Sequence, residues 1–508
     1  MSRFWTGFIW VLVLFGVMPA IASASAQGVS SLIIVIFFGG AALWVLGSAL
    51  NVWPLNQIFS GLGKSSPDFF RWLFFAGRRW EGARYMGAVE EAKFLSPRNK
   101  GWLVDGKGKR VSEQVSYQSM LTVGGMGKGK SSVFVIPNLY TLDNRSMVVT
   151  DTSGELYEQT AQYLEMKGFD IQVLNLMDLT KSKHYNPLAN IRSFTEIQQT
   201  AHLIMKSAPS GKDPKDPFWN LAAEEFLRIL IQCLKNRNEP KHFNLGRLKY
   251  WLNQYTPPSG RLSKLDEFVM ESCGGDPHDP LFNDYKGFVQ ANSKMMSSIV
   301  MTANIALSAL SNPDIANFLS KNEIDFNKLR TRKTILYVMV KQQDLSYYAF
   351  ILNLFYTDLF RHLLAERNPD HLPVYLLLDE FGHLTIPNFA IFATTARKYR
   401  VAFWIFLQSL SQLESRYGQQ EAETITDGLA TDIYMSGLSA KLTEQICKRI
   451  GRKRRTDHRE RSAYGEINLM NADEIISMEN DEVLLLHSNK RPIRMRVTPF
   501  YKQRKWKK

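Results

Sequence analysis

The sequence predicts an α/β fold built on a mostly parallel sheet, and three observations lead to this prediction. The first is a glycine-rich stretch, Gly124–Ser132, which follows a short apolar run. The second is an uninterrupted apolar run, Val374–Leu378, which ends in two carboxylates. The third is the alternation of strand-like runs with amphipathic helical stretches, because that order is typical of parallel sheets covered by helices.

The glycine-rich stretch matches the phosphate-binding pattern G-x-x-x-x-G-K-[ST]. Such a loop turns its N–H groups around the phosphates at the positive end of the next helix. We expect Lys130 on the β- and γ-phosphates and Ser131 on Mg²⁺, although a plain surface loop is the alternative. The following apolar run, Val133–Ile136, is expected to end at Pro137. The predicted nucleotide-binding residues are Gly124, Gly125, Met126, Gly127, Lys128, Gly129, Lys130, Ser131 and Ser132.

An apolar strand that ends in two carboxylates, downstream of a phosphate loop, indicates the second half of a nucleotide-hydrolysis site. We expect Asp379 to hold Mg²⁺ through Ser131 or water, and Glu380 to polarise the attacking water. The next apolar run, Ala402–Leu407, ends at Gln408, which is expected beside the γ-phosphate as a sensor or as a simple strand cap. These roles place the loop and the carboxylates on adjacent strands.

A basic segment lies between these two strands, at residues 394–400. A cation exposed at a subunit edge can stabilise the charge that develops on a neighbouring subunit's nucleotide. We expect Arg397 to be this catalytic cation, with Lys398 and Arg400 as competitors. The alternative is a solvated basic helix face.

The N-terminal region is distinguished by the absence of charge from Phe4 to Gly63. It contains two apolar runs, Thr6–Ala22 and Leu32–Val52, each near the ~20 residues that a bilayer requires. We expect a transmembrane hairpin whose second helix ends in the cytoplasm, because basic residues follow it. A signal peptide cleaved after Ala26 is the competing interpretation.

The amino-acid composition indicates what kind of partner the protein binds and in which cellular compartment its main part lies. The net charge of +14 and the pI near 9.4 favour an anionic partner, either nucleic acid or a membrane surface. A basic cluster at residues 448–455 either contacts phosphates or is an ordinary surface patch. The three cysteines are far apart, so they indicate neither a disulfide framework nor a zinc site, and reduced thiols fit a cytoplasmic body.

Periodicity changes along the chain predict its domains. From about residue 193 to 311 the apolar residues recur at helical spacing, and few strand signals interrupt them. We therefore expect a transmembrane hairpin at 1–55, a nucleotide-binding domain in two parts at 56–190 and 313–508, and an all-α insertion at 191–312.

A series of short motifs runs along the chain besides the hairpin and the phosphate loop: Gly82–Tyr85, Val135–Leu139, Asp151–Leu156, Asn186–Leu188, Phe218–Trp219, Asp379–Phe381, Gln408–Leu413, Tyr417–Gly418 and Ala472–Ile475. With these motifs the chain resembles, over nearly its whole length, the type IV secretion coupling proteins, which are conjugative coupling ATPases. Two features depart from the family pattern: residues 151–155 read Asp-Thr-Ser-Gly-Glu where the family has Asp-Pro-Lys-Gly-Glu, and Lys128 is unusual.

The resemblance implies a hexameric ring of RecA-like domains on the bacterial inner membrane, with the helical domain at the cytoplasmic mouth and ATP and Mg²⁺ as cofactors. It implies delivery of single-stranded DNA with its attached relaxase, and sometimes of proteins, to a type IV secretion channel. The matching site positions are Lys130, Ser131, Asp379, Glu380, Gln408 and Arg397. Alternatives are an FtsK-like DNA translocase, the assembly ATPase of the channel, or a substrate receptor whose hydrolysis is vestigial.

Overall fold

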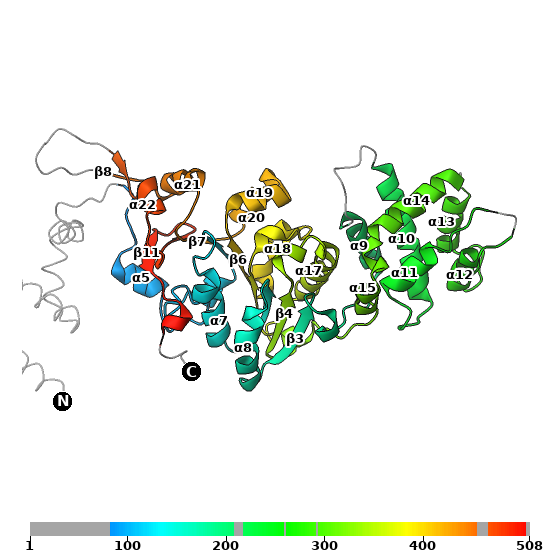
Figure 1. Ribbon diagram of the computed structural model, residues 1–508, viewed down its shortest axis with the longest axis horizontal. Coiled ribbons are helices and arrows are strands. Elements are labelled where there is room, and N and C mark those ends of the chain that lie inside the picture. The colour runs from blue at the N-terminus through cyan, green and yellow to red at the C-terminus, as the bar shows by residue number, and fades with distance from the viewer. Residues whose placement is uncertain (1–81, 208–216, 259–260, 291–292, 455–465, 504–508) are drawn as a thin grey trace, which may run out of the picture. The chain divides into compact units, whose positions relative to one another are not determined.

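The computed structural model describes residues 82–207, 217–258, 261–290, 293–454 and 466–503 (Figure 1). The chain divides into two compact units, 1–81 and 82–508, and all described residues belong to the second. The predicted hairpin and the site after Ala26 lie outside the described residues. Within the described part, no helix has both the length and the apolar character to cross a bilayer.

A nine-stranded sheet organises the described chain, in the order β11-β10-β7-β1-β6-β5-β2-β4-β3. The strands from β7 to β3 pair in parallel, whereas β10 pairs antiparallel with β7 and β11. The predicted mostly parallel sheet is confirmed. The strands are β1 (Met120–Val123), β2 (Ser146–Asp151), β3 (Asp170–Asn175), β4 (Thr334–Met339), β5 (Val374–Leu378), β6 (Val401–Leu407), β7 (Thr431–Tyr434), β10 (Glu482–His487) and β11 (Ile493–Arg496).

Helices cover both faces of the sheet, which explains why its central strands are apolar throughout. Alternate residues of β5 enter opposite cores: Leu376 and Leu378 belong to one, Tyr375 and Leu377 to the other. The first core includes residues of α17 (Ala349–Leu363), α18 (Phe389–Thr395), α19 (Leu410–Tyr417), α20 (Gln419–Asp427), α21 (Ala440–Ile450) and α22 (Ala472–Ile476). The second includes residues of α7 (Ile136–Thr141) and α8 (Glu155–Met166).

The helix after the phosphate loop contradicts one expectation, because it does not end at Pro137. A π-turn, η1 (Ser131–Val135), leads directly into α7, which continues to Thr141. Pro137 occupies the first turn of α7, where its missing N–H leaves no helical hydrogen bond unmade.

Between β3 and β4, the described residues form helices and connecting turns. α10 (Phe218–Asn236) is central: it contacts α9, α11, α12, α13 and α14, and its core residues include Phe226 and Leu230. Because other helices pack around α10, a wide part of its surface is apolar. The surrounding helices are α9 (Phe194–Lys206), α11 (Leu245–Leu252), α12 (Lys264–Ser272), α13 (Pro280–Val289) and α14 (Ser293–Ala306), and α15 (Pro313–Phe318) and α16 (Lys328–Thr331) follow before β4.

The segments that enter and leave this helical region are bonded to each other. Tyr185 donates its backbone N–H to the carbonyl of Phe318 at 3.1 Å, and Glu323 donates to the carbonyl of His184 at 2.9 Å. The Tyr185 hydroxyl also donates to Leu354 in α17, at 3.2 Å. The two segments that connect the helical region to the sheet, around Tyr185 and around Phe318–Glu323, are therefore bonded to each other, and we call them the neck. The Tyr185 hydroxyl anchors the neck to α17, which covers one face of the sheet.

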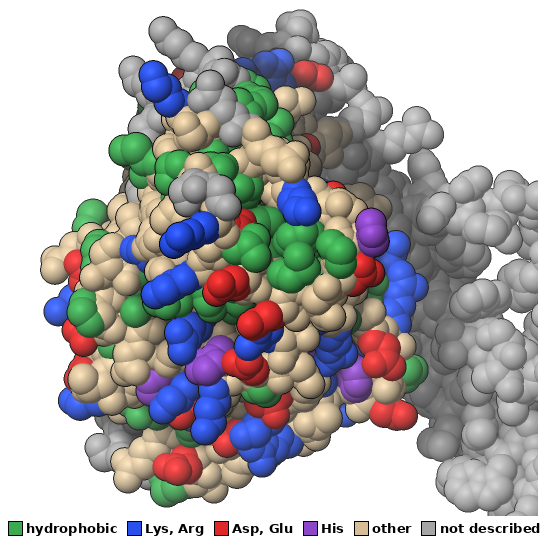
Figure 2. Space-filling view, turned by 90° about the vertical axis from the view of Figure 1, so that its right-hand side faces the viewer, with side chains coloured by type: hydrophobic (Ala, Val, Ile, Leu, Met, Phe, Trp, Pro, Cys, Tyr) green, Lys and Arg blue, Asp and Glu red, His purple; other side chains and the backbone are tan. Residues whose placement is uncertain are grey.

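The face of the helical region in Figure 2 carries basic side chains interspersed with acidic ones, together with a group of hydrophobic side chains. Large apolar side chains exposed on these helices include Leu221 of α10 and Met301 and Ile305 of α14. The two exposed residues of α14 are four positions apart, so they share one side of the helix.

The remaining elements are two short helices, a pair of short strands and the 3₁₀ turns. β8 and β9 form a separate antiparallel pair. The bounds are α5 (Ala88–Phe94), α6 (Glu113–Ser116), β8 (Arg452–Arg454) and β9 (Glu466–Asn468), with short 3₁₀ turns at η2 (Leu179–Lys181), η3 (Ser308–Ser311), η4 (Gln342–Asp344), η5 (Phe381–His383), η6 (Ala396–Tyr399) and η7 (Phe500–Lys502).

Candidate nucleotide-binding site

The glycine-rich loop joins β1 to η1, and two of its glycines require left-handed backbone. Gly127 has φ 67° and Gly129 has φ 80°, a region that residues with a Cβ rarely adopt. Lys130 folds back over the loop, with its Nζ donating to the carbonyls of Gly124 at 2.9 Å and Gly125 at 3.3 Å. Burial lowers the pKa of Lys130, while the nearby Glu380 and Asp379 oppose that shift. A phosphate can replace the two carbonyls as the partner of this ammonium.

The loop and the acidic strand end meet through Ser131 and Asp379. The Ser131 hydroxyl donates to Asp379 Oδ2 at 2.7 Å. Burial raises the pKa of Asp379 to about 6, because the charged form loses its hydration, and the neighbouring Glu380 adds to this effect. A hydroxyl and a carboxylate are oxygen ligands that suit Mg²⁺, which takes one or two carboxylates together with substrate phosphates.

The strand arrangement corrects one expectation, since β1 and β5 are not adjacent. β6 lies between them and pairs in parallel with both. Side chains at the carboxyl ends of β1 and β5 nevertheless meet, because parallel strands end at the same edge and each strand adds only about 4.8 Å.

Among the described residues no cluster of three or more His, Cys, Asp and Glu side chains could hold a metal ion.

Glu380 and Gln408 follow the neighbouring strands β5 and β6 and bond to each other. Gln408 Nε2 lies 3.0 Å from Oε1 and 2.9 Å from Oε2 of Glu380, so the amide donates to the whole carboxylate. The Glu380 backbone is left-handed, with φ 51° and ψ 35°. For a residue other than glycine this conformation costs on the order of 1 kcal/mol or more, and such strain is concentrated at functional sites.

Two residues near Glu380 were missed by the sequence reasoning. His383, in η5, has its Nε2 3.8 Å from Glu380 Oε2 and 3.1 Å from the side-chain amide nitrogen of Gln342. A histidine three residues after the acidic pair is the signal that could have found the first residue. Gln342 follows a different strand, β4, so no local pattern connects it with Glu380.

Arg397 lies in η6 and is exposed. Within the described part of the chain its side chain makes no ion pair or hydrogen bond, and Lys398 is likewise exposed. Arg400 is engaged within its own chain, because its Nη1 donates to the carbonyls of Pro369 at 2.6 Å and His371 at 2.9 Å. The geometry thus leaves Arg397 and Lys398 available to a neighbouring subunit. It excludes Arg400 as a candidate, because that side chain is bonded within its own chain.

Lys128 and Met126 differ from the other residues of the loop. Lys128 Nζ donates to Asn480 Oδ1 at 2.7 Å, in the segment that precedes β10. Its chain passes close to Gly437, where an added Cβ would lie 3.2 Å from Lys128 Cε. Met126 is 75% exposed. Lys128 therefore ties the phosphate loop to the C-terminal part of the sheet.

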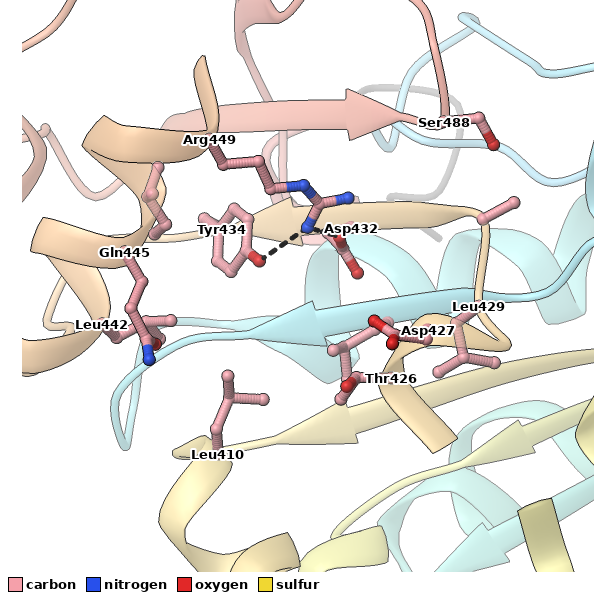
Figure 3. Close-up of a pocket in the computed structure, with 13 residues that line it drawn as sticks. Leu410, Thr426, Asp427, Leu429, Asp432, Tyr434, Leu442, Gln445, Arg449 and Ser488 are labelled. Atoms are coloured by element: carbon pink, nitrogen blue, oxygen red, sulfur yellow. Dashed lines mark hydrogen bonds and ion pairs between the residues drawn. The ribbon is translucent and has the colours of Figure 1, made fainter. Parts of the chain in front are cut away.

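The basic cluster at 448–455 is partly neutralised. Arg449 lines a hollow of about 370 Å³ and pairs there with the buried Asp432, and its Nη1 lies 3.5 Å from the Tyr434 hydroxyl (Figure 3). Arg452 pairs with Glu466 at 3.8 Å. Two of the arginines thus have acidic partners, while Lys448 and Lys453 have no ion pair among the described residues.

Comparison with known proteins places this geometry in a family. The model of the type IV secretory system conjugative DNA transfer family matches residues 82–508. The chain belongs to this conjugative DNA-transfer family. The match includes the phosphate loop, the acidic strand end and the helical region, so it spans every part of the site described above.

Curated members of the conjugative DNA-transfer family are distant in sequence. Protein VirD4 of Rhizobium radiobacter is 23% identical over 412 residues, covering 76% of this chain and 58% of VirD4. The conjugal transfer protein TraG of Agrobacterium fabrum is 22% identical over 447 residues, covering 81% of this chain and 66% of TraG. The chain thus spans less than two thirds of the length of the VirD4 proteins it matches.

Solved structures share the fold. The plasmid coupling protein TrwB in complex with ADP and Mg²⁺ superposes with a TM-score of 0.65 at 19% identity, covering 84% of this chain and 95% of TrwB. The trigonal form of TrwB with sulphate gives 0.64 at 19% identity, covering 83% and 95%. The predicted α/β fold with a mostly parallel sheet is therefore confirmed for the described part of the chain.

Proposed function

We propose that this chain is an ATP-hydrolysing coupling protein that recruits DNA with its relaxase, and also proteins, and delivers them to a type IV secretion channel. The observation that carries the proposal is the 2.7 Å contact between Ser131 and Asp379, which joins a phosphate loop to an acidic strand end. Family membership and the likeness to VirD4 and TraG support the transport task. TrwB structures in complex with ADP and Mg²⁺ and with an ATP analogue support the choice of nucleotide.

ATP and Mg²⁺ fit the residues present. Lys130 would exchange the carbonyls of Gly124 and Gly125 for phosphate oxygens, and Ser131 and Asp379 would hold the metal ion, which would supply positive charge against the phosphates. Loop backbone N–H groups around Gly127 and Gly129 cradle the phosphates. Each of these groups already stands at the shared edge of β1 and β5, so little rearrangement is required.

Glu380 acts as the residue that polarises the attacking water. In the structure its carboxylate accepts from Gln408, and its remaining lone pairs can accept a proton from water. The second N–H of the Gln408 amide can bond to the γ-phosphate or to the water. Arg397 acts on the nucleotide of a neighbouring subunit. If every nucleotide is served in this way, the subunits form a closed ring, and we infer a hexamer.

The proposed anchor is the hairpin at 1–55, which would hold the ring at the bacterial inner membrane. Its support is the charge-free run from Phe4 to Gly63 and the basic residues that follow. The nucleotide-binding domain comprises 56–190 and 313–508, and the insertion comprises 191–312. The bonded neck at Tyr185 and Phe318 supports boundaries close to these positions.

Phosphate release by the purified full chain, measured with and without single-stranded DNA, tests the proposal. Wild type is expected to hydrolyse ATP faster with DNA, while Lys130→Ala and Glu380→Gln are inactive. Lys241→Ala, on an exposed loop of the helical region, is the matched control and retains activity. A mating assay with the same variants should lose DNA transfer for the first two alone. Equal activity of wild type and Lys130→Ala would overturn the ATPase assignment.

A further inference from the structure

Lys128 belongs to the phosphate loop, yet its side chain is bonded to a part of the chain that is distant in sequence. Its Nζ donates to Asn480 Oδ1 at 2.7 Å, in the turn between α22 and β10. Ser436 Oγ donates to the same oxygen at 3.2 Å. An ammonium only donates, so the oxygen and not the nitrogen of the Asn480 amide must face Lys128. Lys128, Asn480 and Ser436 thus form one bonded group, which we call the loop tether.

The aliphatic stem of Lys128 lies against the segment that follows β7. An added Cβ at Gly437 would lie 3.2 Å from Lys128 Cε and 3.5 Å from Gly125 Cα. Gly125 also donates its backbone N–H to the carbonyl of Ser436 at 3.3 Å. The first half of the loop is therefore packed against the segment after β7, and the loop tether fixes the second half.

The second half of the loop has few backbone bonds of its own. Within the described part of the chain, no group accepts a hydrogen bond from the backbone N–H groups of residues 126–129. Unengaged N–H groups of this kind are what a phosphate loop offers to phosphates. Gly127 and Gly129, on either side of Lys128, add conformational freedom to the same stretch. The shape of this stretch consequently depends on side-chain contacts such as the loop tether.

The bonds of Lys130 do not replace the loop tether when phosphate enters. Lys130 Nζ holds two carbonyls of the first half of the loop, and it would give them up for phosphate oxygens. The Lys128 ammonium is directed to Asn480, outside the loop, so its bond does not compete with the phosphates. The loop tether can therefore persist in the nucleotide-bound state.

We propose that Lys128 is a positioning residue for nucleotide binding, which holds the loop in its phosphate-binding shape through Asn480 and does not itself touch the phosphates. The inference rests on the proposed ATPase function and gives a role to a residue that departs from the family pattern. A loop that is held before binding loses less conformational freedom on binding. Since ATP and ADP share the phosphates that the loop cradles, the loop tether raises the affinity for both.

The test measures binding of the non-hydrolysable ATP analogue ADPNP and of ADP, each with Mg²⁺, to the full chain by calorimetry. Lys128→Met keeps the length of the stem over Gly437 and loses the ammonium, whereas Asn480→Ala loses the acceptor. Each variant should raise both dissociation constants about fivefold, because one hydrogen bond to a charged group is lost. The double variant should bind no more weakly than either single variant, because both remove the same bond. The kcat at saturating ATP should stay within about twofold of wild type.

Lys241→Met, which replaces an exposed lysine of the helical region, is the control and should bind both nucleotides as wild type does. A wild type that binds neither nucleotide would refute the proposed function. A wild type that binds both, with Lys128→Met unchanged, would overturn the role of the loop tether alone. So would a Lys128→Met variant that binds ADPNP weakly and ADP normally while Asn480→Ala binds both normally, since Lys128 would then contact the γ-phosphate itself. Melting temperatures without nucleotide identify misfolding, and Asn480→Ala decides the question if Lys128→Met is unstable.

Discussion

Gln408 donates its side-chain amide to both carboxylate oxygens of Glu380, at 2.9 and 3.0 Å. The pair joins the ends of two neighbouring parallel strands, β5 and β6. Glu380 adopts left-handed backbone to make this contact, so the resting position of its carboxylate depends on a partner from outside its own segment.

Replacing Glu380 by glutamine should separate binding from chemistry. The amide keeps the size of the side chain but cannot accept the proton of water, so kcat should fall by about 10²–10⁴ with little change in KM. Steady-state phosphate release measures both constants. Glu323→Gln, on the exposed side of the neck, is the control and should behave as wild type. A large rise in KM for Glu380→Gln would assign the residue to nucleotide binding.

Removing the Ser131 hydroxyl should weaken the binding of Mg²⁺ and leave the contacts to the phosphates unchanged. Ser131→Ala leaves Asp379 without its 2.7 Å donor and removes one proposed Mg²⁺ ligand. We expect the Mg²⁺ concentration for half-maximal hydrolysis to rise about tenfold, a loss of about 1.4 kcal/mol. Ser131→Thr keeps the hydroxyl and should restore the wild-type requirement. Titration of hydrolysis with Mg²⁺ at saturating ATP distinguishes the outcomes, and an unchanged midpoint for Ser131→Ala would contradict the ligand assignment.

The sequence allowed both halves of the site to be predicted, because each half is local. The loop pattern at Gly124–Ser132 and the apolar run before Asp379 are complete within a few residues. The position of β6 between β1 and β5 could not be derived, since strand order follows from tertiary packing and not from any segment. The same limit hid the contacts of Glu380 with Gln408 and of His383 with Gln342.

The error at Pro137 has a different origin. A proline after a short apolar run usually marks a helix end, yet the π-turn η1 shifts the start of α7 so that Pro137 lies in a first turn. Proline does disfavour a helix interior, but the phosphate loop and η1 determine where α7 begins, and they place Pro137 at a position that tolerates proline.

Asp358 makes stability depend on pH through the neck. It lies in α17, buried, and its Oδ2 accepts from Asn190 at 3.1 Å and Tyr185 at 3.3 Å. Burial raises its pKa from 3.8 to about 6, so the folded state binds this proton more tightly than the unfolded state does. The free energy of unfolding therefore falls as pH rises from about 4 to 6, and the penalty is fully present above that range.

Asp358→Asn should remove this penalty. At pH 8 the variant is expected to gain up to about 3 kcal/mol in the free energy of unfolding, and at pH 4 the gain should vanish. Asp370→Asn, at an exposed position, serves as the control and should show no such dependence. Chemical denaturation across this pH range measures the difference. A gain that is equal at both pH values would show that charge burial is not its cause.

Arg397 offers a test of whether neighbouring chains share one site. Its side chain is exposed and forms no bond within the described part of its chain, so truncation to alanine should leave the melting temperature unchanged. If it stabilises charge on a neighbour's nucleotide, Arg397→Ala should lose about 10³-fold or more in kcat with little change in nucleotide affinity. Arg400→Ala should instead lower the melting temperature, because it breaks the bonds to Pro369 and His371.

Mixing variants distinguishes action within a chain from action between chains. Arg397→Ala retains an intact phosphate loop, and Lys130→Ala retains an intact Arg397. In a mixed ring, some interfaces combine the working loop of the first with the working arginine of the second, so the mixture should hydrolyse ATP although neither variant does alone. A mixture as inactive as its components, under conditions where mixed assemblies form, would place Arg397 outside the neighbour's site and favour Lys398, the other exposed cation of η6.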